Sequence, residues 1–348
     1  MLSAEENAML TQTDPGTPMG DLFRRFWMPA MLCDELPGAD CPPIRLRLLG
    51  ENLVGFRDTD GNVGVLDAYC PHLGAHLGVG GVVRGRSVVC PFHGWEFDGQ
   101  GTCTNIPYCD KIPVRAKVDA FTVREVNGIV FVWWDDAGRR PSFDLPDVAG
   151  SELTGWKRHT TLEWRFRSHV QELVENAFDC AHFIPVHGLL ETPTMEIVRN
   201  EGPFLEVFFD NRRRLMGVET KAEMQVKWSG MGLFHIINHT RSHDIHINIL
   251  LTTTPIDEEQ IEVKLDLYFE RRFNRSPKAP LVKWFITKVI RSEFSRDIGI
   301  WERKTYRDPP GLCVEDGPIA KARSWCQQFY PAADRDAVGA DENGMVAM

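Results

Sequence analysis

Short segments in which apolar and polar residues alternate make up most of the first third of the chain. Asp-Gly-Asn at 60–62 and Asn-Gly at 127–128 interrupt this pattern, as the tight turns of hairpins do. We therefore expect a compact all-β unit that ends near Asp136, followed by a polar, proline-bearing linker over 135–146. The segments expected to form its strands are 44–50, 51–69, 95–103 and 121–134.

The N-terminal segment, residues 1 to about 45, shows a helical pattern instead. Leu22, Phe23, Phe26 and Trp27 recur at helical spacing, and Pro29 is expected to end the helix. The pattern predicts a helix that packs on the β unit.

Alternation returns in the second half, over residues 193–275, and predicts antiparallel strands with one buried face. A long amphipathic helix is expected over 284–306, because its apolar residues repeat at helical spacing. The tail 331–348 is polar, contains glycine and lacks periodicity, so we predict disorder there. Candidate lining residues for a cavity beside the sheet are Phe204, Leu215, Met224, Trp228, Met231, Phe234, Ile236 and Ile247.

Composition narrows the class of protein. The 348 residues suffice for two domains, and the fraction of hydrophobic residues, 43%, is ordinary for a globular chain. A net charge of −10 argues against a nucleic-acid partner, because contacts to phosphate need a basic surface. No apolar run is long enough for a membrane span, and the polar N-terminus is unlike a signal peptide. The nine cysteines show no pairing pattern, so we expect a reducing, cytoplasmic location.

Two short motifs each supply one thiolate and one imidazole. Cys70 and His72 come from Cys-Pro-His, and Cys90 and His93 from Cys-Pro-Phe-His. Two cysteines and two histidines fit a tetrahedral zinc site, so the ligand set alone leaves the metal open. Because each loop mixes sulfur and nitrogen, the spacing favours a [2Fe-2S] cluster with one iron on two cysteines and the other on two histidines.

A second group of polar residues lies at 172–188. It contains Asn176, Asp179, His182 and His187. On a helix, Asp179 and His182 would share a face, and Pro185 would end the helix so that His187 returns toward the same point. Two histidines that converge in this way can bind a divalent metal, as in the facial triad of two histidines and one carboxylate that holds non-haem Fe(II).

Both motifs resemble those of the Rieske non-haem iron ring-hydroxylating oxygenases. The cluster motif is C-P-H-x-x-A-H-L with C-P-F-H-G-W, and the iron motif is N-x-x-D-x-x-H-x(4)-H. Ala75 and Phe92 stand where respiratory Rieske proteins carry an additional disulfide, which favours the low-potential oxygenases. His76 is expected to pack beside the cluster and not to bind it. The resemblance implies an α+β chain, with an all-β Rieske domain over 1–140 and a helix-grip-like catalytic domain, an antiparallel sheet flanked by helices, over 141–330.

The resemblance also implies roles for individual residues. The third iron ligand is taken from a C-terminal helix, where D-I-x-I-W-E-x-K points to Asp297, with Glu293 as the competing carboxylate. Asp179, together with Asn176, is expected to act at the iron site. Asp179 would connect His182 to a cluster histidine of a neighbouring subunit, His72 or, by preference, His93. Such a relay requires a head-to-tail ring, and a homotrimer follows from the resemblance.

The expected function is that of the terminal oxygenase component of a Rieske monooxygenase. O2 is the co-substrate, and NAD(P)H electrons arrive through a separate reductase, with or without a ferredoxin, because no dinucleotide-binding glycine motif occurs in the chain. Segments 297–306 and 317–331 resemble 3-ketosteroid 9α-hydroxylase and sterol-oxidising enzymes, which favours a steroid-like or polycyclic apolar substrate.

Other interpretations remain open at this stage. The N-terminal half resembles phthalate-type oxygenases, so aromatic-acid dioxygenation and aryl O-demethylation are alternatives, with Arg212–Arg214 or Arg241 as a cationic anchor. A Rieske electron-transfer protein or a zinc-stabilised binding module would leave the second motif unexplained. A run of histidines, His235, His239, His243 and His246, is expected to contribute pocket polarity and surface, without a metal.

Overall fold

The chain forms two compact units in a computed structural model that describes residues 2–39, 41–135, 138–215 and 217–331. The β unit comprises Phe23–Ala149, and the catalytic unit comprises Met1–Leu22 together with Gly150–Met348. This division differs from the expected domains, since the first 22 residues group with the second unit and the junction lies at 149/150. The predicted disordered tail, apart from Pro331, lies outside the described residues.

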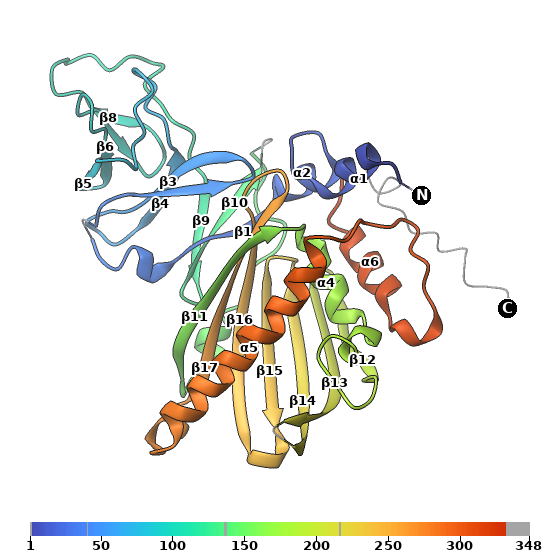
Figure 1. The fold of residues 1–348 in the computed structure, drawn as a ribbon. Coiled ribbons are helices and arrows are strands. Elements are labelled where there is room, and N and C mark those ends of the chain that lie inside the picture. Colours follow the sequence, from blue (N-terminus) through green and yellow to red (C-terminus); the bar gives the residue numbers. More distant parts are fainter. Residues whose placement is uncertain (1, 40, 136–137, 216, 332–348) are drawn as a thin grey trace. The chain divides into compact units, whose positions relative to one another are not determined.

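Three small antiparallel sheets build the β unit (Figure 1), with strand orders β1-β10-β9, β2-β3-β4 and β5-β6-β7-β8. Asn127 and Gly128 adopt φ values of 61° and 76°, the left-handed pair that a two-residue hairpin needs, so the predicted Asn-Gly turn is confirmed. The elements are β1 (Arg25–Leu32), β2 (Ile44–Leu48), β3 (Glu51–Arg57), β4 (Val63–Asp67), β5 (Val82–Arg84), β6 (Ser87–Val89), β7 (Glu96–Asp98), β8 (Cys103–Asn105), β9 (Thr122–Val126), β10 (Ile129–Asp135), a 3-10 turn at Cys33–Glu35 and the short helix α3 (Val148–Ser151).

The expected helix through Phe26 and Trp27 is wrong. Helix α2 (Pro18–Phe23) ends earlier, and β1 pairs with β10 instead. Most side chains on both faces of β1 are buried, so the apolar run lacks the alternation that marks a half-exposed strand. The pairing register shifts between Pro29 and Met31, where the proline has no N–H to offer the ladder.

A seven-stranded antiparallel sheet forms the centre of the catalytic unit. Six of its strands lie within 193–275, where alternation predicted them, whereas the seventh, β11, lies outside that range and was not predicted. The strand order is β11-β17-β16-β15-β14-β13-β12. The first strand of the unit, β11, therefore pairs with the last, β17, and forms one edge of the sheet, while β12 forms the other edge. The strands are β11 (Trp156–Arg167), β12 (Met195–Glu201), β13 (Phe204–Leu215), β14 (Val218–Ser229), β15 (Leu233–Thr240), β16 (Ile245–Pro255) and β17 (Gln260–Glu270).

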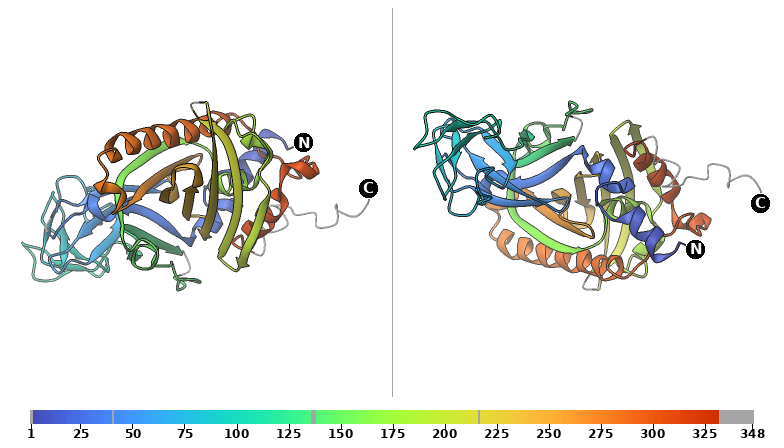
Figure 2. Two further views of the ribbon diagram at one scale, coloured as in Figure 1. Left: turned by 90° about the horizontal axis from the view of Figure 1, so that it is seen from below. Right: turned by 90° about the horizontal axis from the view of Figure 1, so that it is seen from above.

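Helix α5 (Ala279–Trp301), expected from the helical pattern over 284–306, lies along this sheet (Figures 1 and 2). Phe294 and Trp301 of α5 pack on Phe166 of β11. Helix α4 (Val170–Phe178) packs on the sheet through Phe178, which contacts Trp228 of β14. The remaining elements of this unit are α1 (Ala4–Thr11), α6 (Ile319–Gln327) and 3-10 turns at Ala181–Phe183, Arg241–His243, Phe273–Arg275 and Val314–Asp316.

Hydrogen bonds to the catalytic unit explain why the N-terminal residues belong to it. The side-chain amide of Asn7 donates to the backbone carbonyl of Tyr306 at 2.8 Å, and the Thr13 hydroxyl donates to the backbone carbonyl of Asp257 at 2.8 Å. Both bonds join residues hundreds of positions apart, so the segment is fixed by tertiary contacts and not by its sequence neighbours.

A buried network of polar side chains connects α4 to α6 and to Tyr330. Arg323 donates to Glu175 at 2.9 Å, and both side chains are more than nine-tenths buried. Gln171 donates to Glu175 at 2.7 Å and accepts from the Tyr330 hydroxyl at 2.7 Å. A buried carboxylate is tolerable only when it is paired and hydrogen-bonded, so α4 depends on residues near the C-terminus for its position.

Arg323→Met is expected to lower the free energy of unfolding by about 3–5 kcal/mol, because it leaves the Glu175 carboxylate buried without its cation. Urea denaturation measures the change. Arg86→Met, which removes an exposed guanidinium 2.5 Å from the exposed Asp60 carboxylate, is the control and should cost less than about 0.5 kcal/mol. Equal effects of the two substitutions would contradict the role assigned to the network.

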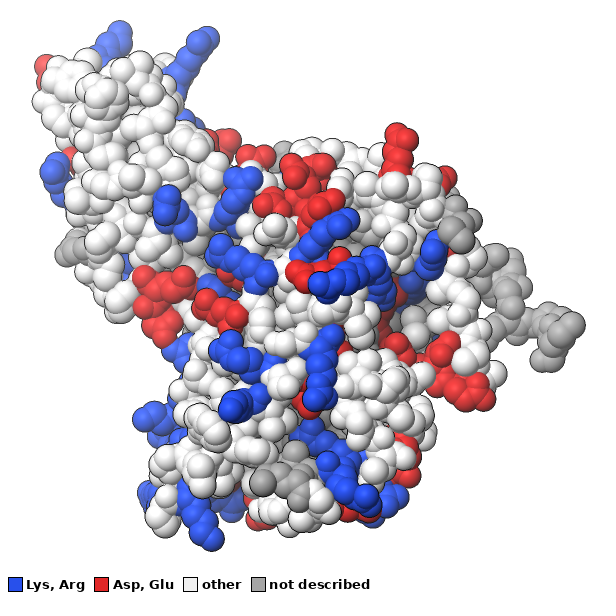
Figure 3. Space-filling view, in the orientation of Figure 1, with Lys and Arg blue, Asp and Glu red and all other residues white. Residues whose placement is uncertain are grey.

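Acidic and basic side chains are interspersed on the face shown in Figure 3. The molecule has exposed ion pairs, such as Arg199 with Glu201 at 2.9 Å. Pairs of this kind contribute little to stability. Among the described helices, none combines the length and the apolar character that crossing a membrane demands.

Candidate functional site

Two loops of matching geometry carry the cysteine and histidine motifs of the β unit. The amide of Gly74 donates to the carbonyl of Cys70 at 2.9 Å, and the amide of Gly94 donates to that of Cys90 at 3.0 Å. Both glycines have a φ of 73°, a backbone conformation that side chains disfavour, so glycine at the fourth position after each cysteine closes the loop.

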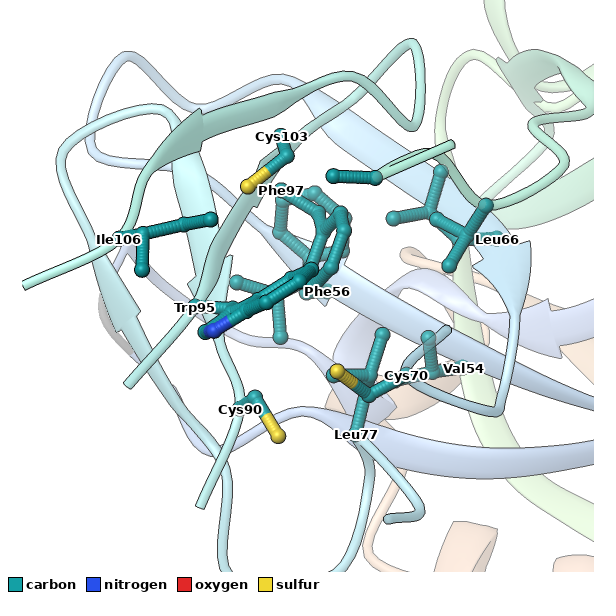
Figure 4. Close-up of a cluster of buried hydrophobic side chains, with 13 residues drawn as sticks. Val54, Phe56, Leu66, Cys70, Leu77, Cys90, Trp95, Phe97, Cys103 and Ile106 are labelled. Atoms are coloured by element: carbon teal, nitrogen blue, oxygen red, sulfur yellow. The ribbon is translucent and has the colours of Figure 1, made fainter. Parts of the chain in front are cut away.

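The predicted cluster ligands lie as two neighbouring pairs. Nδ1 of His72 lies 3.2 Å from Nδ1 of His93, and the two buried cysteines, Cys70 and Cys90, are near each other. Figure 4 shows Cys70 and Cys90 at the edge of the buried apolar core of this unit, beside Trp95. Burial is the main cause that raises the pKa of Cys70 to about 11, and a nearby Cys90 adds to it. Thiols in such a site are stable as thiolates only when a metal compensates their charge, which fits a cluster.

Aromatic residues hold the histidines of these loops. The ring of His72 is stacked on Trp95, with centroids 4.7 Å apart, and the Trp95 indole donates to the Tyr108 hydroxyl at 2.8 Å. Nδ1 of His76 accepts from the amide of Gly78 at 3.0 Å, and its ring packs edge-on against Tyr69 with centroids 5.4 Å apart. Apolar side chains surround the loops on the outside, since Leu73, Phe92 and Tyr108 are each at least 60% exposed.

The second constellation also assembles, from the segment after α4 and from α5. His182, His187 and Asp297 offer one ligand atom each, and these atoms lie within 4.8 Å of one another. Asp297 is buried and its Oδ1 has no hydrogen-bond partner in the described structure, although Nε2 of His187 is 3.1 Å away. An orphaned carboxylate oxygen beside two imidazoles fits a divalent metal that accepts all three donors.

The local backbone differs from the expected helix. Helix α4 ends at Phe178, Asp179 is its C-cap, and His182 lies in the 3-10 turn Ala181–Phe183. Asp179 and His182 nevertheless stay in contact, because the Asp179 carboxylate accepts from the His182 amide at 3.2 Å. The amide of His187 in turn donates to the carbonyl of Phe183 at 3.2 Å, so a helical turn brings His187 back past Pro185.

The outward nitrogens of both histidines are occupied. Nδ1 of His182 lies 2.5 Å from the carbonyl of Asp179, and Nδ1 of His187 lies 2.7 Å from the Glu293 carboxylate. Such partners fix the tautomer and leave each Nε2 with its lone pair toward the metal position. Glu293, the competing ligand in the sequence analysis, therefore contacts Nδ1 of His187, on the side away from the candidate metal position. Asp297, one helical turn later, lies near Nε2 on the side of that position.

Charge around His187 matters for metal uptake. Burial alone would lower the pKa of His187, but the neighbouring carboxylates of Asp297 and Glu293 outweigh it and raise the pKa to about 9. Burial lowers the pKa of His182, although the contacts with Asp179 oppose this effect. In the metal-free state His187 holds a proton near neutral pH, and a bound cation must replace it.

The apparent affinity for Fe(II) is expected to fall by about tenfold per pH unit from pH 8.5 to 6.5, because the metal must displace that proton. Anaerobic titration of iron-depleted protein that retains its cluster measures this slope. Glu293→Gln should weaken binding by about ten- to a hundredfold and flatten the profile above pH 7.5. An affinity for Fe(II) that is constant between pH 7.5 and 8.5 in the unmodified chain would contradict the assignment.

Asn176 and Asp179 lie beside the convergent donors His182, His187 and Asp297. Nδ2 of Asn176 lies 3.5 Å from Nε2 of His182, and its carbonyl oxygen accepts from the Trp301 indole at 3.3 Å. The Asp179 side chain is 35% exposed, and one of its oxygens lies 3.9 Å from Nδ1 of His182. Asp179 is thus open to contact from outside the catalytic unit.

Sequence reasoning missed two positioning residues. Glu293 was weighed only as a ligand, and Trp301 only as part of the apolar face of α5. The spacing of Glu293 and Asp297, four residues apart on one helix, places them on one face, so both can reach the same histidine. His235, one of the run of histidines, is buried and contacts Asn248 at 2.6 Å, which assigns it to packing within the sheet.

Comparison with known proteins agrees with both halves of this architecture. Residues 26–122 match the Rieske [2Fe-2S] domain, and residues 132–330 match the 3-ketosteroid 9alpha-hydroxylase C-terminal domain. Cholesterol 7-desaturase nvd of Xenopus laevis is 33% identical over 81% of this chain and 67% of its own length. A probable 3-ketosteroid-9-alpha-monooxygenase oxygenase component of Rhodococcus rhodochrous is 30% identical over 95% of this chain and 85% of its own length.

Solved structures show the same fold. NdmA of Pseudomonas putida CBB5 superimposes with a TM-score of 0.71 at 21% identity, covering 92% of this chain and 98% of that one. Dicamba monooxygenase bound to dicamba gives a TM-score of 0.69 at 18% identity, covering 88% and 97%. At this identity the likeness concerns the fold.

Proposed function

Since the chain belongs to the Rieske non-haem iron oxygenases with a 3-ketosteroid 9α-hydroxylase C-terminal domain, we propose that it oxidises a steroid-like substrate as the oxygenase component of a monooxygenase. The observation that carries this proposal is the match of residues 132–330, which contain the three convergent donors His182, His187 and Asp297. The likeness to dicamba monooxygenase concerns the fold alone, so it lends no support to aromatic-acid chemistry in this chain.

The residues have separate tasks in this proposal. Cys70, His72, Cys90 and His93 hold the cluster, and His182, His187 and Asp297 hold Fe(II). The iron supplies the capacity to activate O2 beside the substrate once electrons arrive. Glu293 and the Asp179 carbonyl keep the histidines in the ligating tautomer, and Asn176 places an amide next to His182.

Aromatic residues shape the surroundings of the site. Phe183 lies between the histidines and the sheet, 4.3 Å from the ring of His182 and 5.5 Å from Phe209 of β13 by centroids. Such a wall excludes water from the reacting position and offers contact to an apolar substrate.

We assign the delivery of electrons to a second copy of the chain. The exposed Asp179 carboxylate would accept a hydrogen bond from a cluster histidine, by preference His93, of the neighbouring subunit. The exposed apolar residues around the cluster, Leu73, Phe92 and Tyr108, would be covered by that neighbour. A head-to-tail homotrimer, fed by an NAD(P)H-dependent reductase, is the proposed assembly. A cytoplasmic location is supported by nine cysteines, none of which forms a disulfide.

Desaturation is the second candidate reaction, because a relative that is 33% identical is named a cholesterol 7-desaturase. Hydroxylation converts C–H, O2, two electrons and two protons into C–OH and water. Desaturation uses the same O2, electrons and protons to remove two hydrogens as a second water. The two reactions therefore differ in whether oxygen enters the product.

Turnover in 18O2 with a reductase, NADH and either a 3-ketosteroid or cholesterol tests the proposal. A hydroxylated steroid that carries one labelled oxygen supports monooxygenation, whereas an unlabelled alkene supports desaturation. Oxidation of phthalate-type acids with no turnover of either steroid would overturn the proposed substrate class.

A further inference from the structure

A second set of two histidines and one carboxylate lies at the hairpin between β15 and β16 (Figure 1). His239 of β15 and His246 of β16 are directly opposite in the strand register. Their rings are stacked, with centroids 3.9 Å apart and an interplanar angle of 10°. Opposite positions on antiparallel strands bring side chains close enough to share one ligand.

The hairpin turn supplies the carboxylate. Oδ1 of Asp244 lies 3.3 Å from Nε2 of His239 and 3.1 Å from Nε2 of His246. Asp244 has a φ of 47°, in the left-handed region that aspartate tolerates, and this conformation turns the chain into β16. The turn is tied to β14, because the Lys221 amide donates to the Ser242 hydroxyl at 3.2 Å.

Glu223 and Arg241 fix the orientation of the His239 ring. Its Nδ1 lies 3.4 Å from the carboxylate of Glu223, the opposite residue on β14, and Glu223 is held in turn by Arg241. Nε2 of His239 is buried and has no hydrogen-bond partner in the described structure. In metal-binding histidines, one ring nitrogen typically contacts a carboxylate while the other nitrogen is left for the metal. His239 has this arrangement, with Nδ1 near Glu223 and Nε2 without a hydrogen bond to the described residues.

We propose that His239, Asp244 and His246 bind one divalent cation of the zinc class. Two imidazole nitrogens and one carboxylate oxygen are donors that Zn2+ accepts, with water completing the shell. An ion lies in the plane of each imidazole that binds it, so the stacked rings must rotate about their outer torsions on binding. Those torsions are broad for histidine, so the rotation costs little.

This site repeats the donor set of the iron site in different surroundings. The iron-site ligand Asp297 is buried, whereas Asp244 is 77% exposed. The hairpin site is therefore open to metal from solution, and its occupant would link the ends of β15 and β16. The sequence analysis expected polar surface without a metal along this run of histidines, and the proposal departs from that expectation at His239 and His246. His243 is exposed and lies outside the proposed set.

Zinc titration of the protein loaded with cluster and iron tests the proposal, with calorimetry and elemental analysis as readouts. One additional zinc per chain is expected. Asp244→Asn and His246→Ala should each weaken this binding by at least about tenfold, and Glu223→Gln by about ten- to a hundredfold. His243→Ala, in the same turn but outside the set, is the matched control and should bind like the unmodified chain.

Zinc that displaces iron is distinguished by repeating the titration on His187→Ala, where the additional zinc should persist. Thermal melting of each variant in the presence of a chelator shows whether the metal-free variant folds. If His246→Ala does not fold, Asp244→Asn still tests the proposal, because Asp244 is exposed and its substitution should not disturb the fold. Absence of an additional zinc, or binding that Asp244→Asn leaves unchanged, would overturn the proposal. Equal loss of binding in His243→Ala would also overturn it.

Discussion

Asp297→Ala is expected to abolish turnover, lowering it by more than about a hundredfold, and to reduce bound iron by about one atom per chain while the cluster remains. The carboxylate has an orphaned oxygen among two imidazoles, and its removal leaves two neutral donors that hold Fe(II) weakly. Iron analysis, the electron paramagnetic resonance signal of the reduced cluster and steroid turnover are the measurements.

Glu302→Gln is the matched control for this substitution, since it alters a carboxylate at the end of the same helix and outside the donor set. It should leave iron content and turnover unchanged. Full iron content in Asp297→Ala would show that another residue, Glu293 above all, supplies the third ligand.

Asp179→Asn is expected to lower turnover by at least about a hundredfold while iron and cluster are both retained. The amide keeps the shape of the side chain, but it loses the charge that favours a hydrogen bond from a cluster histidine. In stopped-flow experiments the chemically reduced cluster should be reoxidised more slowly when O2 and substrate are added. Asp210→Asn, at an exposed position of β13, is the control.

Mixed assemblies separate transfer between chains from transfer within one chain. Asp179→Asn chains keep the cluster, whereas Cys90→Ala chains lack the cluster but keep Asp179 and the iron site. Co-assembled trimers should recover part of the activity, because the cluster of the first chain serves the iron of the second. Mixtures as inactive as the separate variants, despite proven co-assembly, would contradict the head-to-tail relay.

Local chemistry made much of the fold predictable. The Asn127-Gly128 turn requires positive φ at two successive residues, and few residue pairs provide it as readily. The long helix that carries Asp297 was predicted from apolar residues at helical spacing, and the structure places a helix there. By contrast, β1 was predicted as a helix, because burial on both faces removes the alternation by which strands are recognised.

The candidate site was predictable as a set of residues but not as a geometry. Motif order led to His182, His187 and Asp297, which the fold brings together. The resemblance favoured Asp297 over Glu293, but the helical pattern alone could not separate them, because both lie on one face of α5. Packing against His187 places Glu293 at Nδ1 and Asp297 at Nε2 of that ring. Likewise, the pairing of His239 with His246 depends on the length of an irregular turn, which sets the strand register.

The most direct test of the two-site oxygenase is the amount of iron and acid-labile sulfide in anaerobically purified protein, compared with a His182→Ala/His187→Ala double variant. We expect about three irons and about two sulfides per chain, with about one iron lost in the variant and the cluster signal unchanged. Zinc in place of iron, or the same iron content in the variant, would contradict the account.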